Sequence, residues 1–300
     1  MPVGRRRRTV AIRDDPPQPG EAAARLRTRL GWSSSDLRRE ISHRNLRLAE
    51  HLPHESTFGD VPSVLYREEE GTHGNFLAAS FRRICAAPDW RRRLEKCYTA
   101  NHRVPRSQDR SRRELDCAHS SDALLMNIFC YPGLTSRRSV CSLLGVEPGL
   151  RPAFGVRIQT PCSTGLGDRT EIDMTLGELL VEAKLTEAGF ASARNDLVSR
   201  YVDVDDVFDF AELPTDGERY RHYQLIRGIL AAHHYRRSFL LLCDARRCSL
   251  IEDWYRVVRA IRHCELRSRT MLLTWQELAT TLPKKLQVFL HEKYGIDANP

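Results

Sequence analysis

The fold of this chain is decided by one stretch, TEIDMTLGELLVEAKL, which covers residues 170–185. Residues 170–175 and 178–185 both alternate polar or charged side chains with apolar ones, which is typical of half-buried strands. Leu176 and Gly177 lie between the two segments and supply a tight turn. The stretch therefore predicts a two-stranded hairpin.

Acidic side chains gather on one side of the first strand. Side chains two positions apart share a face of a strand, so we expect Glu171 and Asp173 to point one way and Ile172 and Met174 the other. This strand then has a carboxylate face and an apolar face.

The second strand carries an acid and a base on the same face. Glu182 and Lys184 are two apart, whereas Val181, Ala183 and Leu185 form the opposite, apolar face. Across a hairpin the polar faces of both strands converge, which places carboxylates and an ammonium in one patch. The alternative is an exposed strand edge that carries a surface ion pair.

Carboxylates crowded on neighbouring strands are electrostatically costly unless a cation accompanies them, and their oxygens are suitable ligands for Mg²⁺. A magnesium ion in such a patch polarises a phosphoryl oxygen and lowers the pKa of a bound water. A neighbouring lysine positions that water and offsets negative charge that develops at phosphorus. The patch therefore predicts metal-assisted attack on a phosphodiester.

The segments 170–173 and 180–184 together resemble the PD-(D/E)xK nuclease superfamily of restriction enzymes and Holliday-junction resolvases. The resemblance covers about residues 114–278. It implies that Asp173 and Glu182 bind magnesium and that Lys184 is the family's lysine. Ile172 stands where the family often has a proline, which many of its branches lack.

The resemblance also points to residues outside the hairpin. A family helix that follows the hairpin often supplies a glutamine, which implies a catalytic role for Gln224, and Arg227 on the same helix is a candidate phosphate contact. An upstream acid is expected from Glu114, Asp116 or Asp122. We take Asp122 as the candidate metal ligand, the alternative being a helix-cap residue.

Composition fits a globular protein with a polyanionic partner. Of 300 residues, 41% are hydrophobic and 29% are charged, and 47 lysines and arginines face 39 acids, for a net charge of +8. The arginine-rich basic set favours bidentate phosphate contacts, although a modest positive charge also serves solubility alone.

The densest basic region runs from Arg82 to Arg113. We expect it to follow a phosphate backbone, with Arg106 and Arg110 as nucleic-acid contacts. The alternative is a solvated helix face.

Several classes of protein are excluded by what the sequence lacks. The longest strongly apolar run, residues 239–243, is far too short to cross a membrane, and the arginines at residues 5–8 are not followed by the apolar core of a secretion signal. Nine cysteines are scattered without a C-x-x-C pair, which favours reduced thiols and a cytoplasmic location over a metal-thiolate site. A G-x-S-x-G elbow of a serine hydrolase is also missing.

The organisation expected is α/β, with a restriction endonuclease-like core in which helices flank a central mixed sheet of four or five strands. Residues 1–20 are expected to form a basic flexible leader, 21–70 a helical extension and connector, and 71–300 the nuclease-like domain with a basic helical lead-in. Further helices are expected over 123–129, 188–199, 220–234 and 250–264, and further strands over 154–160, 238–244 and 271–274. An acidic loop, 203–209, is expected near the mouth of the site.

The function expected is a magnesium-dependent nuclease that hydrolyses phosphodiester bonds of DNA, with Mn²⁺ as a substitute metal. DNA is the expected partner, a homodimer is left open, and no membrane association is expected. The alternative is an inactive nucleic-acid-binding module with a nuclease-like fold.

Overall fold

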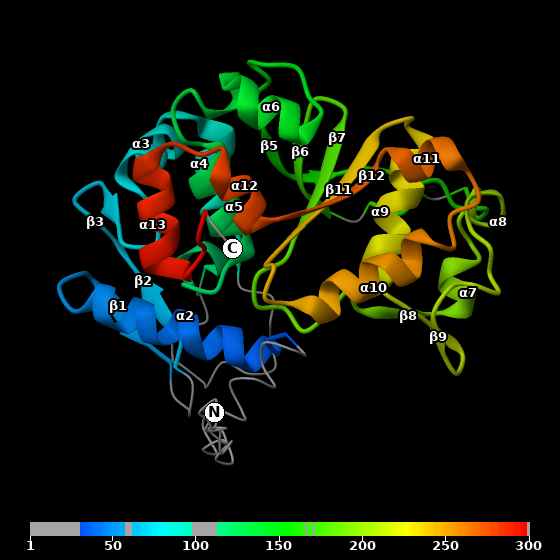
Figure 1. The fold of residues 1–300 in the computed structure, drawn as a ribbon, viewed down its shortest axis with the longest axis horizontal. Helices are drawn as coiled ribbons and strands as arrows, with labels where there is room; N and C mark the ends of the chain where they lie inside the picture. Colours follow the sequence, from blue (N-terminus) through cyan, green and yellow to red (C-terminus); the bar gives the residue numbers. More distant parts are fainter. Residues whose placement is uncertain (1–30, 58–61, 98–112, 166, 170, 299–300) are drawn as a thin grey trace, which may run out of the picture.

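A five-stranded mixed sheet runs through the centre of the protein, between two layers of helices (Figure 1). The computed structural model describes residues 31–57, 62–97, 113–165, 167–169 and 171–298. The strand order is β12-β11-β7-β6-β5, where β5 is Ala153–Arg157, β6 is Glu171–Leu176, β7 is Leu179–Ala183, β11 is Ser238–Cys243 and β12 is Thr270–Thr274. The predicted α/β class and mixed central sheet are confirmed.

Strand β7 is the middle of the sheet and the place where its two halves meet. It pairs antiparallel with β6, which in turn pairs antiparallel with β5, and it pairs parallel with β11, which pairs parallel with β12. Every residue of β7 is buried, as is usual where helices cover both faces. The predicted hairpin is confirmed, with Gly177 at φ +57° in its turn.

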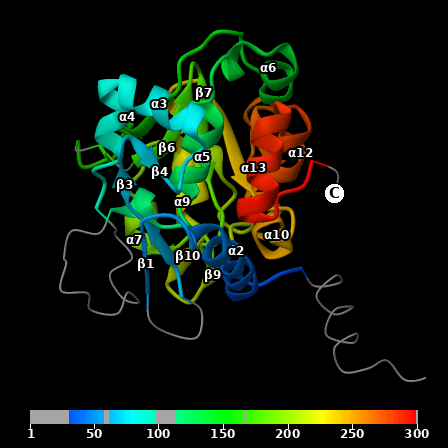
Figure 2. The same ribbon diagram turned by 90° about the vertical axis from the view of Figure 1, so that its left-hand side faces the viewer.

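Alternation along β7 directs its side chains to two different hydrophobic cores. Leu180 packs into the core that contains α9 (Tyr223–His234) and α10 (Cys248–Val258). Val181 and Ala183 pack into the core on the opposite face. Helices that contribute to this second core include α5 (Ser121–Phe129), α6 (Arg138–Leu144), α12 (Trp275–Thr280) and α13 (Lys284–Tyr294) (Figures 1 and 2).

Strand β6 departs from strict alternation. Met174 packs into the core beside α5, whereas Ile172 packs into the core beside α9, so our expectation that these two side chains share a face was wrong. The neighbouring strand pairs Phe154 with Met174 and Val156 with Ile172, and between these pairs Gly155 has φ +63°. A positive φ is easily adopted only by glycine, and it turns the course of the strand at this point.

The chain before β5 packs around the α5 side of the sheet. Helix α2 (Ser34–Ala49) begins with a capping box formed by Ser33 and Asp36, and it lies against α13 (Figure 2). Pro88 separates α3 (Ala78–Ala86) from α4 (Pro88–Arg93). Short elements in this part are β1 (His54–Ser56), β2 (Val64–Tyr66), β3 (Glu68–Glu69), β4 (Thr72–His73) and the 3-10 turns Glu114–Asp116 and Leu134–Ser136.

The segment after β7 differs from the expected helix over 188–199. It forms β8 (Ser192–Arg194) and the short α7 (Asn195–Val198), and β8 joins β9 (Thr215–Asp216) and β10 (Arg219–Arg221) in a small antiparallel sheet. Ala191, at φ +53°, lies in the middle of the expected helix and interrupts it.

The acidic segment 203–209 also lies elsewhere than expected. It contains α8 (Val204–Val207), and Asp203 and Asp206 face His234 and His233 at the carboxyl end of α9. At 1.5 Å per residue this is roughly 15 Å along the axis from the first turn of that helix. The acids therefore have the two histidines as partners, at the opposite end of α9 from Gln224. The remaining helix is α11 (Cys264–Ser268). No helix of the described part combines the length and the apolar character needed to cross a bilayer.

Candidate active site

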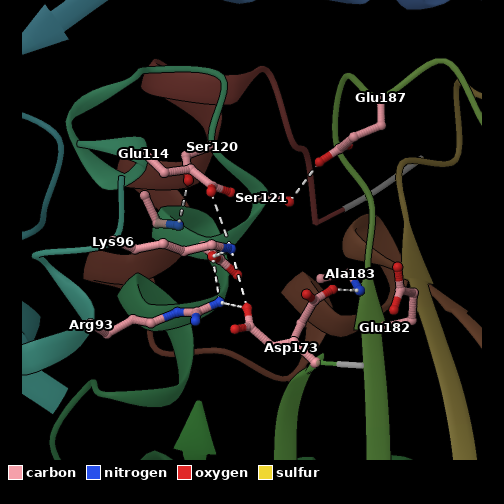
Figure 3. Close-up of polar contacts among 12 residues, drawn as sticks. Arg93, Lys96, Glu114, Ser120, Ser121, Asp173, Glu182, Ala183 and Glu187 are labelled. Carbon is pink, nitrogen blue, oxygen red and sulfur yellow. Dashed lines mark hydrogen bonds and ion pairs between the residues drawn. The ribbon is translucent and has the colours of Figure 1, made fainter. Parts of the chain in front are cut away.

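Asp173 lies where β6 and β7 part from each other. Their ladder runs from Leu176 with Leu179 to Met174 with Val181. One residue further, Asp173 Oδ2 accepts a hydrogen bond from the backbone N–H of Ala183 at 2.8 Å (Figure 3). The carboxylate thus takes a β7 amide that a neighbouring strand would otherwise satisfy, which fixes its position over the end of β7.

Glu182 and Lys184 form a buried ion pair. Glu182 is 2% exposed and Lys184 5%, and Lys184 Nζ lies 2.7 Å from Glu182 Oε1. The lysine backbone is held as well, since its N–H donates to the carbonyl of Leu242 at 2.8 Å and its carbonyl accepts from Trp275 Nε1 at 2.8 Å. The pair therefore lies inside the sheet, and the alternative of a surface ion pair on a strand edge is excluded.

The charges of these side chains act strongly on one another. Burial raises the pKa of Asp173 well above its ordinary value, and the negative charges of Glu182 and Asp122 raise it further. Burial acts to lower the pKa of Lys184, but nearby carboxylates, Glu182 first, outweigh it and raise that pKa. Lys184 therefore stays protonated, while Asp173 lies where an additional cation would be stabilising.

Asp122 reaches the site from the first turn of α5. The helix cap is Ser120, whose Oγ accepts from the N–H of Ala123 at 3.1 Å, so Asp122 is free of the capping role that was its alternative. Its Oδ2 instead accepts from Arg93 Nη2 at 2.7 Å and Lys96 Nζ at 2.8 Å (Figure 3). Asp122 is 3% exposed.

The other two upstream acids have different surroundings. Glu114 Oε2 lies 3.1 Å from Lys96 Nζ, so Glu114 joins the same group of charges. Asp116 instead pairs with His73, at 3.1 Å between Oδ1 and Nε2. The structure thus brings Asp122 and Glu114 to the site and leaves Asp116 outside it.

A family model described as Restriction Endonuclease associating with ARP matches residues 46–295. The chain belongs to this restriction endonuclease family. The match spans all five strands of the central sheet together with Asp122, Asp173, Glu182 and Lys184, so the resemblance seen in the hairpin is confirmed at the level of the family. Neither the curated proteins nor the solved structures that were compared gave a match.

Gln224 and Arg227 of this REase-ARP family member lie on α9. The N–H of Gln224 donates to the carbonyl of Phe190 at 3.1 Å, and the Phe190 ring centre lies 5.8 Å from Lys184 Nζ, so the first turn of α9 approaches the lysine. Arg227 is 6% exposed and donates to the carbonyl of Glu171 at 3.2 Å. Arg106 and Arg110 lie outside the described residues. The roles of all four in catalysis or nucleic-acid binding stay predictions.

Three residues of the site were missed from the sequence. Arg93 and Lys96 fell within the basic region that we assigned to nucleic acid, and nothing local indicated carboxylate partners for them. Glu187 accepts from the N–H of Leu185 at 2.6 Å and from Ser121 Oγ at 2.7 Å (Figure 3), which ties the end of β7 to the start of α5. Its place just beyond the E-x-K sequence was the one available signal.

The donor set of this family member suits a hard divalent cation. Among the described residues, no three His, Cys, Asp or Glu side chains are already grouped as a metal site. The carboxylate oxygens are engaged by Lys184, by Arg93 and Lys96, and by the amide of Ala183. Asp173 and Glu182 nevertheless offer carboxylate oxygens on adjoining strands, and the charges of Glu182 and Asp122 that raise the pKa of Asp173 are ones that a magnesium ion would offset.

Proposed function

We propose that this chain is a metal-dependent nuclease that hydrolyses phosphodiester bonds of DNA, with Mg²⁺ as the metal and Mn²⁺ as a substitute. One observation carries the proposal: where β6 and β7 diverge, Asp173 accepts the amide of Ala183, which lies in the chain between the two members of the buried ion pair Glu182–Lys184. Membership in a restriction endonuclease family supports the same reaction class.

Asp173 and Glu182 are the residues that would hold the metal. The predicted role of Asp122 as a further ligand is not taken into the proposal, because Arg93 and Lys96 engage its carboxylate. When bound, the ion supplies polarisation of a phosphoryl oxygen and a lowered pKa for an attacking water. Neighbouring carboxylates raise the pKa of Lys184, which supports a role as a cation near negative charge that develops on phosphorus rather than as a general base. The amide of Gln224 offers a donor and an acceptor to water or phosphate from the first turn of α9.

Partners are proposed from charge and from the family. A net charge of +8, mostly from arginine, supports DNA as the ligand, with Arg227, Arg106 and Arg110 as contacts. The family description names association with ARP, and we extend this to the chain as part of the proposal. The nine cysteines are free, which supports the proposed cytoplasmic location.

The test is a cleavage assay on supercoiled plasmid, linear duplex, branched and single-stranded DNA, with Mg²⁺ and with EDTA. We expect cutting only with the metal, and its loss in Asp173→Asn and in Lys184→Met. Matched controls are Asp216→Asn and Lys285→Met, which change exposed side chains that the structure does not bring to the site. Cutting that survives both site variants refutes the proposal. Salt-sensitive DNA binding with neither cleavage nor magnesium binding would identify an inactive binding module instead.

A further inference from the structure

Two protein cations lie among carboxylates beside Asp173. Lys96 Nζ contacts three of them, at 2.8 Å to Asp122 Oδ2, 3.1 Å to Glu114 Oε2 and 3.3 Å to Glu171 Oε1. Arg93 Nη2 bridges two of the same acids, at 2.7 Å to Asp122 and 2.6 Å to Glu171 (Figure 3). An ammonium surrounded by three carboxylates has the kind of oxygen environment that a metal ion takes.

The position of these cations is built into the fold. The side chain of Arg93 is 9% exposed and that of Asp122 4%, so their pair is shielded from water, where charge-assisted hydrogen bonds are strong. Gly155 makes room for the guanidinium, because a Cβ at that position would lie 2.1 Å from Arg93 Nη1. The bend in β5 and the path of Arg93 thus depend on the same glycine.

The carboxylates around Arg93 and Lys96 adjoin the proposed metal position. The charge of Asp173 acts on Arg93, and the charge of Asp122 acts on Asp173. Centres with two metal ions hold them about 4 Å apart and need acids on both sides. The site has enough acids for two ions, namely Glu114, Asp122, Glu171, Asp173, Glu182 and Glu187. Three of these acids already contact Lys96.

We propose that Arg93 and Lys96 fill the second cation position of the site, so that the protein binds a single divalent ion, at Asp173 and Glu182. This inference rests on the proposed function for the first ion, whereas the second position rests on the contacts of Arg93 and Lys96 alone. Removing the ammonium of Lys96 leaves Asp122, Glu114 and Glu171 with less positive charge and opens room for a second ion.

The test counts bound ions by calorimetric titration of the full chain with Mn²⁺, without DNA. We expect one ion for the wild type, two for Lys96→Met and one again for Lys96→Met combined with Asp122→Asn. Arg92→Met, which changes an exposed arginine of α4 four positions before Lys96, is the matched control and should bind one ion. Lys96→Arg keeps the charge and should also bind one. Should Lys96→Met not fold, Lys96→Gln, which keeps a polar head group, is titrated in its place.

Two results overturn the inference: two ions in the wild type, or no additional ion when Lys96 loses its charge. A third result is also informative: the wild type binds no ion, and Lys96→Met binds one ion that is lost when Asp122→Asn is added. That result supports the second position and refutes the proposed centre at Asp173 and Glu182. Loss of the wild-type ion in Asp173→Asn supports that centre. The two proposals therefore fail separately.

Discussion

Lys184→Met is expected to destabilise the protein strongly when divalent ions are absent. The substitution keeps an unbranched stem like that of lysine and removes the ammonium, which leaves the carboxylate of Glu182, 2% exposed, without its partner. A buried charge that loses its partner retains the cost of leaving water and loses the attraction that offset it.

The size of the effect follows from the geometry of the pair. At 2.7 Å, and with an effective dielectric constant of about 20, the attraction between the two charges is about 6 kcal/mol. Part of the lost attraction is recovered when Glu182 takes up a proton or water enters. We therefore expect the free energy of unfolding to fall by about 3–5 kcal/mol, the range typical when one member of a buried pair is removed.

The assay is urea denaturation in EDTA at pH 7. It compares the wild type with Lys184→Met, Glu182→Gln and the double variant that carries both substitutions. The double variant should recover most of the loss, since neither charge is left unpaired. The reasoning is wrong if Lys184→Met costs less than about 1 kcal/mol, the value of an exposed pair. It is equally wrong if the double variant is as unstable as Lys184→Met.

Three further changes test other parts of the structure. Asp173→Asn should raise the free energy of unfolding of the metal-free protein at pH 7. An aspartate whose pKa is raised in the folded state contributes stability that is present below its unfolded pKa and is lost as the pH rises. The gain from asparagine, measured by denaturation, should therefore vanish toward pH 4. Gly155→Ala should lower the free energy of unfolding more than Gly217→Ala does. Both glycines have positive φ, but only at Gly155 does an added Cβ meet a neighbour, Arg93. Thermal unfolding should show that Gly155→Ala loses roughly 1–3 kcal/mol more than Gly217→Ala. Ser120→Ala removes the side-chain cap of α5 and should cost about 1 kcal/mol in the same measurement.

The hairpin and its three charged residues could be predicted because the information is local. At the end of β7 and directly after it, apolar and charged residues alternate, with Val181 and Ala183 apolar and Glu182 and Lys184 charged, so one turn at Gly177 sets the faces of the strand. The same alternation failed in β6, where the change of side at Asp173 depends on a bend in the neighbouring strand.

What could not be predicted depends on contacts between distant parts of the chain. Arg93 and Glu171 are 78 positions apart, and their pairing requires that α4 lie over the edge of β5. The residues from 188 to 199 have acceptable helix propensity, yet β8 gains its hydrogen bonds from β10, with Ala193 opposite Tyr220. In both places tertiary partners outweighed the local signal.

The two hydrogen bonds that fix the backbone of Lys184 determine when the candidate site can form during synthesis of the chain. The hydrogen bonds to its backbone come from Leu242 and Trp275, more than fifty residues later in the chain. A growing polypeptide that has passed the E-x-K sequence still lacks β11, β12 and the indole that orient this lysine. The proposed cutting centre is thus completed only after β11, β12 and Trp275 have left the ribosome.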